Sequence, residues 1–189
     1  ANAVHGITAA VIAQSPRLIL QIGCGGGFSQ AGLAIGDVAV ATAEIDAHLG
    51  VAADRSGADV GRLSFPVIAQ TGKTIFNRYP VDDAESSRVH DKLKEALADT
   101  GVNVYTGPFI TDATVTASTS RAEALYRYHQ ALVENMEGAG AAHVAALYDN
   151  PFVEIRAVSK RVGDRDKERW DLPLAFQRCA QAVRAYLLN

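Results

Sequence analysis

Cysteine is scarce in this chain, with two residues among 189, and tryptophan and methionine occur once each. Cys24 and Cys179 lie far apart and show no metal-binding spacing, so we expect reduced thiols and a cytoplasmic protein rather than a disulfide framework. The chain has no run of eighteen apolar residues, and its first residues carry neither a basic segment nor a signal-type apolar core. The sequence therefore predicts no transmembrane helix and no membrane partner.

An excess of positive charge is also missing, because 18 Lys and Arg residues face 21 Asp and Glu residues, for a net charge of −3. A protein that binds nucleic acid needs a basic face, so we expect no nucleic-acid partner. The five histidines form no H-x-x-x-H or H-E-x-x-H pattern, which predicts no metal site. His143 is expected to be a core or interface histidine, with a catalytic role as the less favoured alternative. Without a G-x-S-x-G motif, a nucleophile elbow is not expected either.

What the chain does contain is ample material for a core, since 48% of its residues are hydrophobic. Its length suits a single domain over residues 1–189. The extended stretch 109–118 is rich in β-branched residues, whereas 46–66 reads as a long loop, a lid or disordered. A capping-box pattern, Ser120 with Glu123, opens one helix. We expect helices at 3–14, 83–99, 120–128, 137–148 and 173–188, and strands at 18–22, 37–44, 102–105 and 152–158.

Glycines crowd the end of the first expected strand, in Gly23-Cys24-Gly25-Gly26-Gly27. Such a run allows positive φ angles and a close approach of backbone N–H groups to a ligand, although a tight turn packed against a helix is the alternative. A dinucleotide fingerprint needs a third glycine where Phe28 stands, so a nicotinamide site is disfavoured and no cofactor is expected. Thr71-Gly72-Lys73-Thr74 is not a phosphate-binding loop, because Val67 replaces its first glycine.

The stretch 131–171 combines strand and helix signals in one unit. An apolar run at 131–133 leads into Met136-Glu137, which opens a helix of small residues, and Asp149-Asn150-Pro151 ends that helix. A buried strand then ends at Ser159-Lys160 in a polar loop. In open parallel sheets, ligands bind beyond the carboxyl ends of the strands. Both Met136-Glu137 and Ser159-Lys160 are expected at such ends, so a site is predicted there.

These residues also carry a resemblance. Met136-Glu137 followed by Arg156-Ala-Val-Ser159 resembles the nucleoside phosphorylase/nucleosidase superfamily, and Ser159-Lys-Arg-Val-Gly-Asp-Arg-Asp166 with Trp170-Asp-Leu-Pro173 resembles the futalosine hydrolases of menaquinone biosynthesis. The resemblance implies a three-layer α/β/α domain with a central mixed, largely parallel sheet, and a homodimer or higher homo-oligomer. It implies a small-molecule nucleoside substrate, futalosine, from which hypoxanthine is released by hydrolysis of the N-ribosidic bond.

The resemblance also implies roles for individual residues. Glu137 would take hydrogen bonds from the 2′- and 3′-hydroxyls of the sugar, a task that suits a carboxylate with several acceptor sites. The alternative is a carboxylate that merely starts a helix, which the positive end of a helix favours. Thr114 and Val115 would hold the base through their backbone. The alternative for this stretch is a cross-strand threonine ladder. The implied substrate-binding residues are Cys24, Gly25, Gly26, Thr114, Val115, Met136, Glu137 and Ser159, and the implied catalytic residues are Glu137 and Lys160.

Two departures from the resembled pattern are visible. Lys160 stands where the adenosine-type nucleosidases have aspartic acid and futalosine hydrolases have asparagine. An ammonium can donate toward N7 or O6 of a purine, but burial disfavours its charge, and it could instead point to solvent. The second departure is that the first strand of the relatives, with its water-activating carboxylate, is expected to be absent before Ala1.

Three functions follow for testing. The first is hydrolysis of futalosine, and a second is binding of a purine nucleoside without catalysis. A phosphate-dependent phosphorylase is disfavoured, because no Arg or His is expected beside residues 23–28 to hold phosphate. Alternation of Asp164, Asp166 and Asp171 with basic residues predicts a surface salt-bridged loop, with a role above the base as the alternative.

Overall fold

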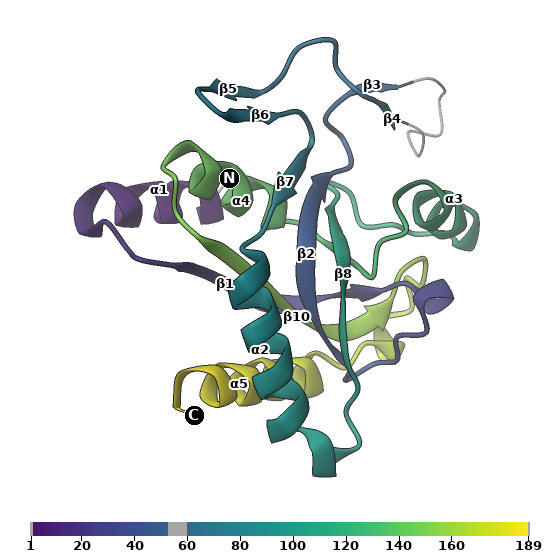
Figure 1. Cartoon of the computed structure of the whole chain (residues 1–189). Coiled ribbons are helices and arrows are strands. Elements are labelled where there is room, and N and C mark those ends of the chain that lie inside the picture. The colour runs from purple at the N-terminus through teal and green to yellow at the C-terminus, as the bar shows by residue number, and fades with distance from the viewer. Residues whose placement is uncertain (1, 53–59, 189) are drawn as a thin grey trace.

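The computed structural model describes residues 2–52 and 60–188. Six strands form one mixed sheet in the order β10-β1-β9-β8-β2-β7 (Figure 1). Because β10 also pairs with β2, the strands other than β7 curl into a closed ring, and β7 extends β2 on the outside. The bounds of the strands are β1 Ile19–Gly27, β2 Val38–Asp46, β7 Arg78–Pro80, β8 Val104–Thr111, β9 Val133–Asn135 and β10 Phe152–Arg161.

Parallel pairing joins the longest strands of this sheet. β1 lies parallel to β10 and β2 lies parallel to β8 along most of their lengths, whereas shorter antiparallel pairings join β1 to β9, β10 to β2 and β2 to β7. β10 is buried from Phe152 to Lys160. A strand buried on both faces has a nearly continuous apolar sequence, which is why residues 152–158 could be recognised as a strand. The strand continues through Ser159 and Lys160 to Arg161, so the expected loop begins only at Val162.

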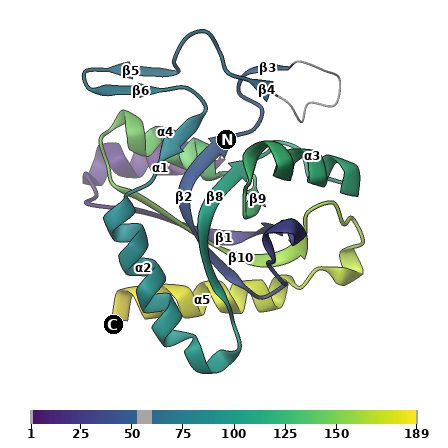
Figure 2. The same ribbon diagram turned by 45° about the vertical axis from the view of Figure 1, so that its right-hand side comes forward.

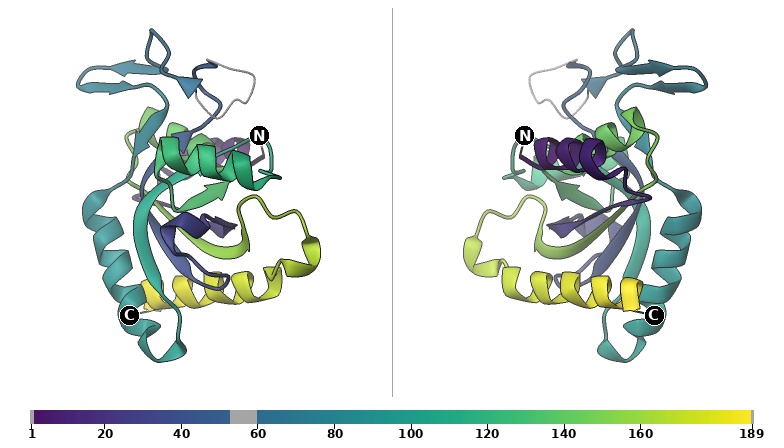
Figure 3. Two further views of the ribbon diagram at one scale, coloured as in Figure 1. Left: turned by 90° about the vertical axis from the view of Figure 1, so that its right-hand side faces the viewer. Right: turned by 90° about the vertical axis from the view of Figure 1, so that its left-hand side faces the viewer.

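Helices cover both faces of the sheet. α2 (Asp83–Ala96) and α5 (Leu172–Leu188) pack together over β1, β2 and β10, and α1 (Asn2–Gln14) packs against α4 (Gly138–Leu147) on the opposite face (Figure 2). In Figure 3 the yellow helix α5 lies below the sheet and the purple helix α1 lies above it. Two separate apolar clusters fill these two layers. The predicted α/β fold with a mixed sheet between helices is confirmed. None of the described helices is both long enough and apolar enough to cross a bilayer.

Short strands fill much of the region between β2 and α2. These are β3 Val51–Ala52, β4 Val60–Gly61, β5 Ile68–Gln70 and β6 Lys73–Ile75, which form two small hairpins above the main sheet (Figure 1). Part of the long loop expected at 46–66 is therefore strand, while its residues 53–59 lie outside the described part of the chain. Thr71-Gly72 is the turn between β5 and β6, and Gly72 has a φ of 77° there. Such a two-residue hairpin turn favours glycine.

β8 is one strand rather than the two extended segments expected at 102–105 and 109–118. Pro108 lies inside it, opposite a register shift between Ala41 and Ala43 of β2. Proline lacks a backbone donor and is tolerated in a sheet at such a bulge. Residues 112–118 leave the sheet, so the threonine-ladder alternative for this stretch is wrong. The chain then enters α3 (Thr119–His129), whose N-cap is Ser118 and not the expected Ser120. Three single-turn helices complete the elements of the described residues, η1 Ser29–Ala31, η2 Ala98–Thr100 and η3 Lys167–Arg169.

Candidate active site

The glycines of residues 23–27 belong to β1 and do not form the expected loop. Their φ angles are not positive, so conformational freedom does not explain them. The glycines are explained by the lack of room for a side chain. A Cβ atom on Gly23 would lie 2.8 Å from Nη1 of Arg156, and one on Gly25 would lie 2.5 Å from Cγ1 of Val133. One on Gly26 would lie 3.3 Å from Cε of Lys160. The glycine run lets the side chains of neighbouring strands pass close to the backbone of β1.

The register between β1 and β10 aligns two parts of the sequence that lie far apart. Gly23 is opposite Arg156 and Gly26 is opposite Lys160, with a bulge between Gly25 and Gly26. Ser159 occupies the bulge, where its Oγ donates a hydrogen bond to the carbonyl oxygen of Gly25 at 3.2 Å. The motif 156–160 is therefore placed directly beside the glycine strand.

A cavity of about 190 Å³ lies where β1, β9 and β10 meet. Every residue that the sequence implied for the substrate or for catalysis lines it, and so do four residues that were not assigned a role. The geometry brings the implied residues together, while their individual roles stay predictions. The lining residues are Cys24, Gly25, Gly26, Thr114, Val115, Glu134, Asn135, Met136, Glu137, Ser159, Lys160, Trp170 and Leu172.

Glu137 stands at the N-cap of α4, with its side chain free of any capping bond. The cap is provided by other residues: Oδ1 of Asn135 accepts from the backbone N–H groups of Glu137 at 2.9 Å and Gly138 at 2.7 Å. Oγ1 of Thr111 accepts from N–H of Ala139 at 2.7 Å. The Glu137 side chain is 44% exposed and is thus available to a ligand in the cavity. The positive end of the helix favours its negative charge.

Arg156 links Glu137 to the sheet. Its side chain is only 3% exposed and donates through Nη1 to Oε2 of Glu137 at 3.2 Å and to the carbonyl oxygen of Cys24 at 3.2 Å. Its Nε donates to Oε1 of Glu154 at 2.7 Å. Burial lowers the pKa of Arg156, but the two glutamates outweigh that effect and raise it. The expectation that no arginine lies beside residues 23–28 was wrong, because strand pairing, not sequence proximity, places Arg156 there.

Lys160 does not point to solvent. Lys160 is only 8% exposed. Its Nζ lies 3.5 Å from Oε2 of Glu134 and 5.2 Å from the centre of the Trp170 ring. Glu134 is also buried and accepts a hydrogen bond from Oγ1 of Thr116. Burial raises the pKa of Glu134, and Thr116 and Lys160 oppose that rise. This part of the cavity thus contains a buried ion pair beneath an indole ring.

Thr114 and Val115 reach the cavity through a turn that Asp112 organises. Oδ1 of Asp112 accepts from the backbone N–H of Thr114 at 2.7 Å and from its hydroxyl at 2.8 Å. Asp112 also pairs with Arg121 at 2.8 Å and with Nε2 of His48 at 3.2 Å. A side chain that bonds to its own following backbone builds such an Asx turn. Val115 remains 37% exposed at the cavity.

The acidic stretch 164–171 forms the expected salt-bridged surface loop. Arg169 pairs with Asp164 at 3.4 Å and with Asp166 at 3.2 Å, and Oδ1 of Asp171 accepts from the N–H of Leu174 at the start of α5. Nε1 of Trp170 donates to the carbonyl oxygen of Asp164 at 3.3 Å. These contacts hold the indole ring over Lys160, so the loop contributes Trp170 to the cavity and its aspartates to the surface.

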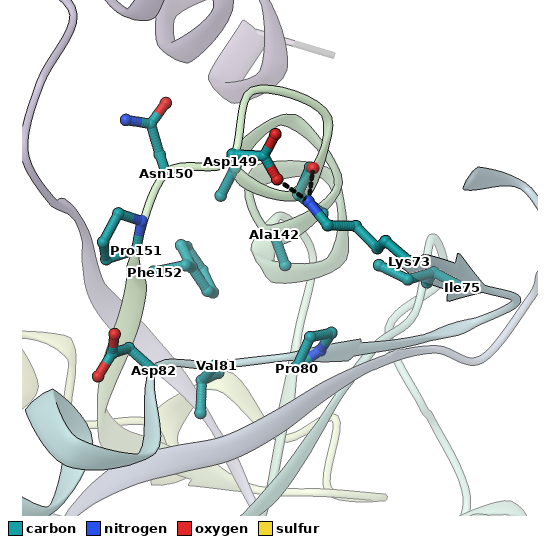
Figure 4. A pocket seen from close by; sticks show the side chains of 12 residues that line it. Lys73, Ile75, Pro80, Val81, Asp82, Ala142, Asp149, Asn150, Pro151 and Phe152 are labelled. Atoms are coloured by element: carbon teal, nitrogen blue, oxygen red, sulfur yellow. Dashed lines mark hydrogen bonds and ion pairs between the residues drawn. The ribbon is translucent and has the colours of Figure 1, made fainter. Parts of the chain in front are cut away.

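A second cavity of about 290 Å³ lies at the opposite end of β10, beside Pro151 and Phe152 (Figure 4). Its one ammonium, on Lys73, is already used, because it donates to the carbonyl oxygen of Ala146 at 2.6 Å and pairs with Asp149. Most of the remaining wall is small or apolar, with residues from β6, α4, β10 and the segments next to them. Its polar groups therefore do not converge on a ligand as those around Glu137 and Lys160 do.

Two further expectations concern histidine and metals. His143 of α4 is half-buried, and its Nδ1 lies 3.1 Å from the hydroxyl of Tyr79. Burial lowers its pKa, as befits a packed neutral histidine. Within residues 2–52 and 60–188, no three His, Cys, Asp or Glu side chains are grouped so that they could hold a metal ion.

Some lining residues were not singled out by the sequence. Glu134 and Asn135 directly precede Met136-Glu137, and two polar residues at the end of a short buried strand were the available signal. Trp170 and Leu172 were part of a recognised motif without an assigned role. The contribution of Arg156 to the Glu137 site required knowledge of which strand lies beside β1.

Comparisons with known proteins show the family of the chain. Residues 1–189 match the family model of the phosphorylase superfamily. The futalosine hydrolase of Acidothermus cellulolyticus is 34% identical over 89% of this chain and 63% of its own length, so the chain spans less than two thirds of that relative. The futalosine hydrolase of Thermus thermophilus is 31% identical over 98% of this chain and 76% of its own length. The resemblance inferred from the motifs is confirmed.

Solved structures share the fold. The S-adenosylhomocysteine nucleosidase of Streptococcus pyogenes, in complex with 5-methylthiotubericidin, has a TM-score of 0.74 at 23% identity, over 98% of this chain and 73% of its own. The 5′-methylthioadenosine/S-adenosylhomocysteine nucleosidase of Neisseria meningitidis has a TM-score of 0.76 at 20% identity, over 98% and 75% of the two chains.

Proposed function

The chain belongs to the phosphorylase superfamily, and from this premise we propose that it hydrolyses the N-ribosidic bond of a 6-oxopurine nucleoside, with futalosine as the substrate. Two curated relatives of similar sequence are futalosine hydrolases, which supports this choice. Water adds its oxygen to C1′ and loses a proton. The C1′–N9 bond breaks, and its electron pair leaves with the base, which takes up a proton and departs as hypoxanthine.

The observation that carries the proposal is the placement of Glu137 and Lys160 around one cavity. Cleavage of this bond develops positive charge on the sugar, so contacts to the sugar hydroxyls that tighten in the transition state accelerate it. Glu137 is exposed to the cavity, and Arg156 fixes the direction of its carboxylate. We propose that Glu137 accepts hydrogen bonds from the 2′- and 3′-hydroxyls. Met136, which is 52% exposed, would contact the apolar face of the sugar.

Negative charge develops on the leaving base, and a donor aimed at that charge stabilises the transition state. We assign this role to the ammonium of Lys160. We propose that the backbone of Thr114 and Val115 contacts the base. The floor beneath the ribose is formed by Cys24, Gly25, Gly26 and Ser159. All of these residues line the same cavity, which supports their joint assignment.

Phosphorolysis is disfavoured on electrostatic grounds. Arg156 lies opposite Gly23 on the neighbouring strand, and both Glu137 and Glu154 pair with it. A phosphate anion bound there would face two carboxylates. Its binding would therefore lose much of the attraction that arginine otherwise gives to phosphate.

We further propose a role in menaquinone biosynthesis, a cytoplasmic location, and a homodimer or higher homo-oligomer built from a single domain. These follow from the family resemblance of the motif 159–173. The proposed partners are the small-molecule nucleoside and further copies of the chain, with no nucleic acid and no membrane.

The direct test measures by chromatography the release of hypoxanthine from futalosine, with and without added phosphate. We expect release that phosphate does not stimulate. Calorimetry with futalosine and with hypoxanthine completes the test. Binding without release would indicate a nucleoside-binding protein, and release that depends on phosphate would indicate a phosphorylase, so either result contradicts hydrolysis.

A further inference from the structure

We propose that Lys160 and Glu134 act as one unit that selects a 6-oxopurine and rejects a 6-aminopurine, with Glu134 positioning the ammonium of Lys160. The inference rests on the proposed function, because it concerns the same cavity. Lys160 would touch the base, whereas Glu134 acts through Lys160.

The first argument is the hydrogen-bonding capacity of Lys160. An ammonium has three donors and no acceptor. Among the described residues its one hydrogen bond goes to Oε2 of Glu134, and that bond is long, at 3.5 Å. The ring of Trp170, at 5.2 Å, contributes a cation–π contact and no acceptor atom. Lys160 therefore brings unused N–H groups to a cavity that it lines.

The second argument is that the surrounding residues hold this ammonium in place. Gly26 leaves room for it, since a Cβ atom at Gly26 would lie 3.5 Å from Nζ and 3.3 Å from Cε of Lys160. Glu134 in turn is fixed by Thr116, whose Oγ1 donates to Oε1 and whose backbone N–H donates to Oε2 at 3.4 Å. Because both residues of the pair are buried, their side chains have little freedom to adopt other positions.

The third argument is charge. A buried ammonium without a partner tends to lose its proton, because burial disfavours the charged form. The carboxylate of Glu134 offsets this tendency. Removal of one partner from a buried ion pair leaves an uncompensated charge, so Glu134 is the counter-charge that the buried ammonium of Lys160 requires.

The chemistry of the base then decides which purine fits. A 6-oxopurine presents two acceptors, N7 and O6, on one edge, and lysine or arginine commonly reads this pair of acceptors. A 6-aminopurine presents N7 together with the N6 amino donor. The amino group would meet an ammonium that can only donate. We therefore expect hypoxanthine to bind about 10- to 100-fold more tightly than adenine, in line with the discrimination of a well-placed paired contact.

The experiment measures binding of the free bases hypoxanthine and adenine by calorimetry to the wild-type chain and to Lys160→Met and Glu134→Gln, between pH 6 and pH 10. We expect the wild type to prefer hypoxanthine by about 10-fold or more and Lys160→Met to lose that preference. In Glu134→Gln, Lys160 loses its counter-charge, so hypoxanthine affinity should fall at a lower pH than in the wild type. A purely structural role for Glu134 would not move this pH profile.

Lys167→Met is the matched control, since this lysine is exposed on the loop that carries Trp170. It should leave both the preference and the pH profile unchanged. If a single variant fails to fold, Lys160→Met/Glu134→Gln removes both charges together and leaves no buried charge unpaired. That double variant should also lose the preference for hypoxanthine.

Free bases separate this inference from the proposed function. Preference for hypoxanthine without hydrolysis of futalosine would support the inference and contradict the function. Hydrolysis with equal affinity for the two bases would do the reverse. Equal affinities, no measurable binding of hypoxanthine, or an unchanged preference in Lys160→Met would each overturn the inference.

Discussion

Glu44 of β2 and Glu154 of β10 meet through their carboxyl groups beneath the first turn of α4, and both residues are 0% exposed. A Cβ atom on Gly138 would lie 2.6 Å from Oε2 of Glu154 and 2.7 Å from Cδ of Glu44, so only glycine fits above the pair. Burial, and then the charge of Glu154, raise the pKa of Glu44 well above its ordinary value. Two adjacent buried carboxylates cannot both be ionised, so we infer that Glu44 holds a proton and donates it to Glu154 in a hydrogen bond.

This carboxyl pair connects to the candidate active site through Arg156. Nε of Arg156 donates to Oε1 of Glu154, and its Nη1 donates to Glu137. Thr111 and Asn135, which cap α4, also donate to Oε1 of Glu44. One proton shared by Glu44 and Glu154 leaves a single negative charge opposite the guanidinium. The charge balance beneath α4 therefore depends on the protonation of Glu44.

The first prediction concerns Glu44→Gln and pH. A raised pKa means that the folded protein binds more protons than the unfolded chain. The contribution of Glu44 to stability is therefore fully present below the ordinary pKa of 4.5. It is lost as pH rises through the folded pKa. Glutamine resembles the protonated acid and has no proton to lose. We expect the free energy of unfolding in urea to fall less with rising pH in Glu44→Gln than in the wild type.

The matched variant for this experiment is Glu154→Gln. It removes the charge that balances Arg156 on the sheet side, and breaking a buried pair costs about 3–5 kcal/mol. We expect clear destabilisation at neutral pH, in contrast to Glu44→Gln. Equal slopes of stability against pH in Glu44→Gln and the wild type would show that Glu44 does not carry the proton.

The second prediction concerns Glu137→Gln. The side chain is 44% exposed, and Arg156 keeps Glu154 as a partner, so the fold should be retained. Loss of charged hydrogen bonds to the sugar hydroxyls costs about 1.5–3 kcal/mol each, or about 10- to 100-fold in affinity. We expect this loss for futalosine and little change for free hypoxanthine, measured by calorimetry. Glu95→Gln, an exposed glutamate of α2, is the control. Equal losses for both ligands would remove Glu137 from the sugar site.

The third prediction compares two glycines. A Cβ atom at Gly25 would lie 2.5 Å from Val133 and 2.9 Å from the backbone oxygen of Glu134, so Gly25→Ala forces β1 and β9 apart. Overpacking of this kind costs about 1–3 kcal/mol. A Cβ atom at Gly6 in α1 would meet no other atom within 4 Å, and Gly6→Ala should stabilise the helix by up to about 1 kcal/mol. Thermal unfolding of the two variants measures both effects. A harmless Gly25→Ala would refute the close approach of the strands.

The fourth prediction concerns the cap of α4. Asn135→Ala removes the acceptor for two backbone N–H groups and the donor to Glu44. Loss of a side-chain cap costs about 1 kcal/mol, and an unsatisfied buried partner adds about 1–3 kcal/mol. We expect urea denaturation to report destabilisation in this range, together with weaker binding of futalosine, because Glu137 sits on the loosened turn. Unchanged stability would mean that water replaces the amide at no cost.

The sequence located the site through local signals. Met136-Glu137 follows an apolar run and opens a helix of small residues, and Ser159-Lys160 ends a recognisable buried strand, so both could be placed near a sheet end. The glycines at 23–27 were also noticed, but for the wrong reason. A loop with positive φ angles was expected, whereas Arg156 and Lys160 require the absence of side chains on a regular strand.

The amino-acid sequence by itself determined the alternation of helices and strands, the family resemblance and the carboxylate at the start of α4, since periodicity, helix stops and contiguous motifs are local properties. Only the tertiary structure decided that the side chain of Arg156 packs against Gly23. It likewise decided that Lys160 pairs with Glu134 and that the carboxyl groups of Glu44 and Glu154 are in contact. Each of these contacts joins residues on different strands. Their distance depends on strand order and register, which are fixed by packing of the whole sheet and not by any short segment of the chain.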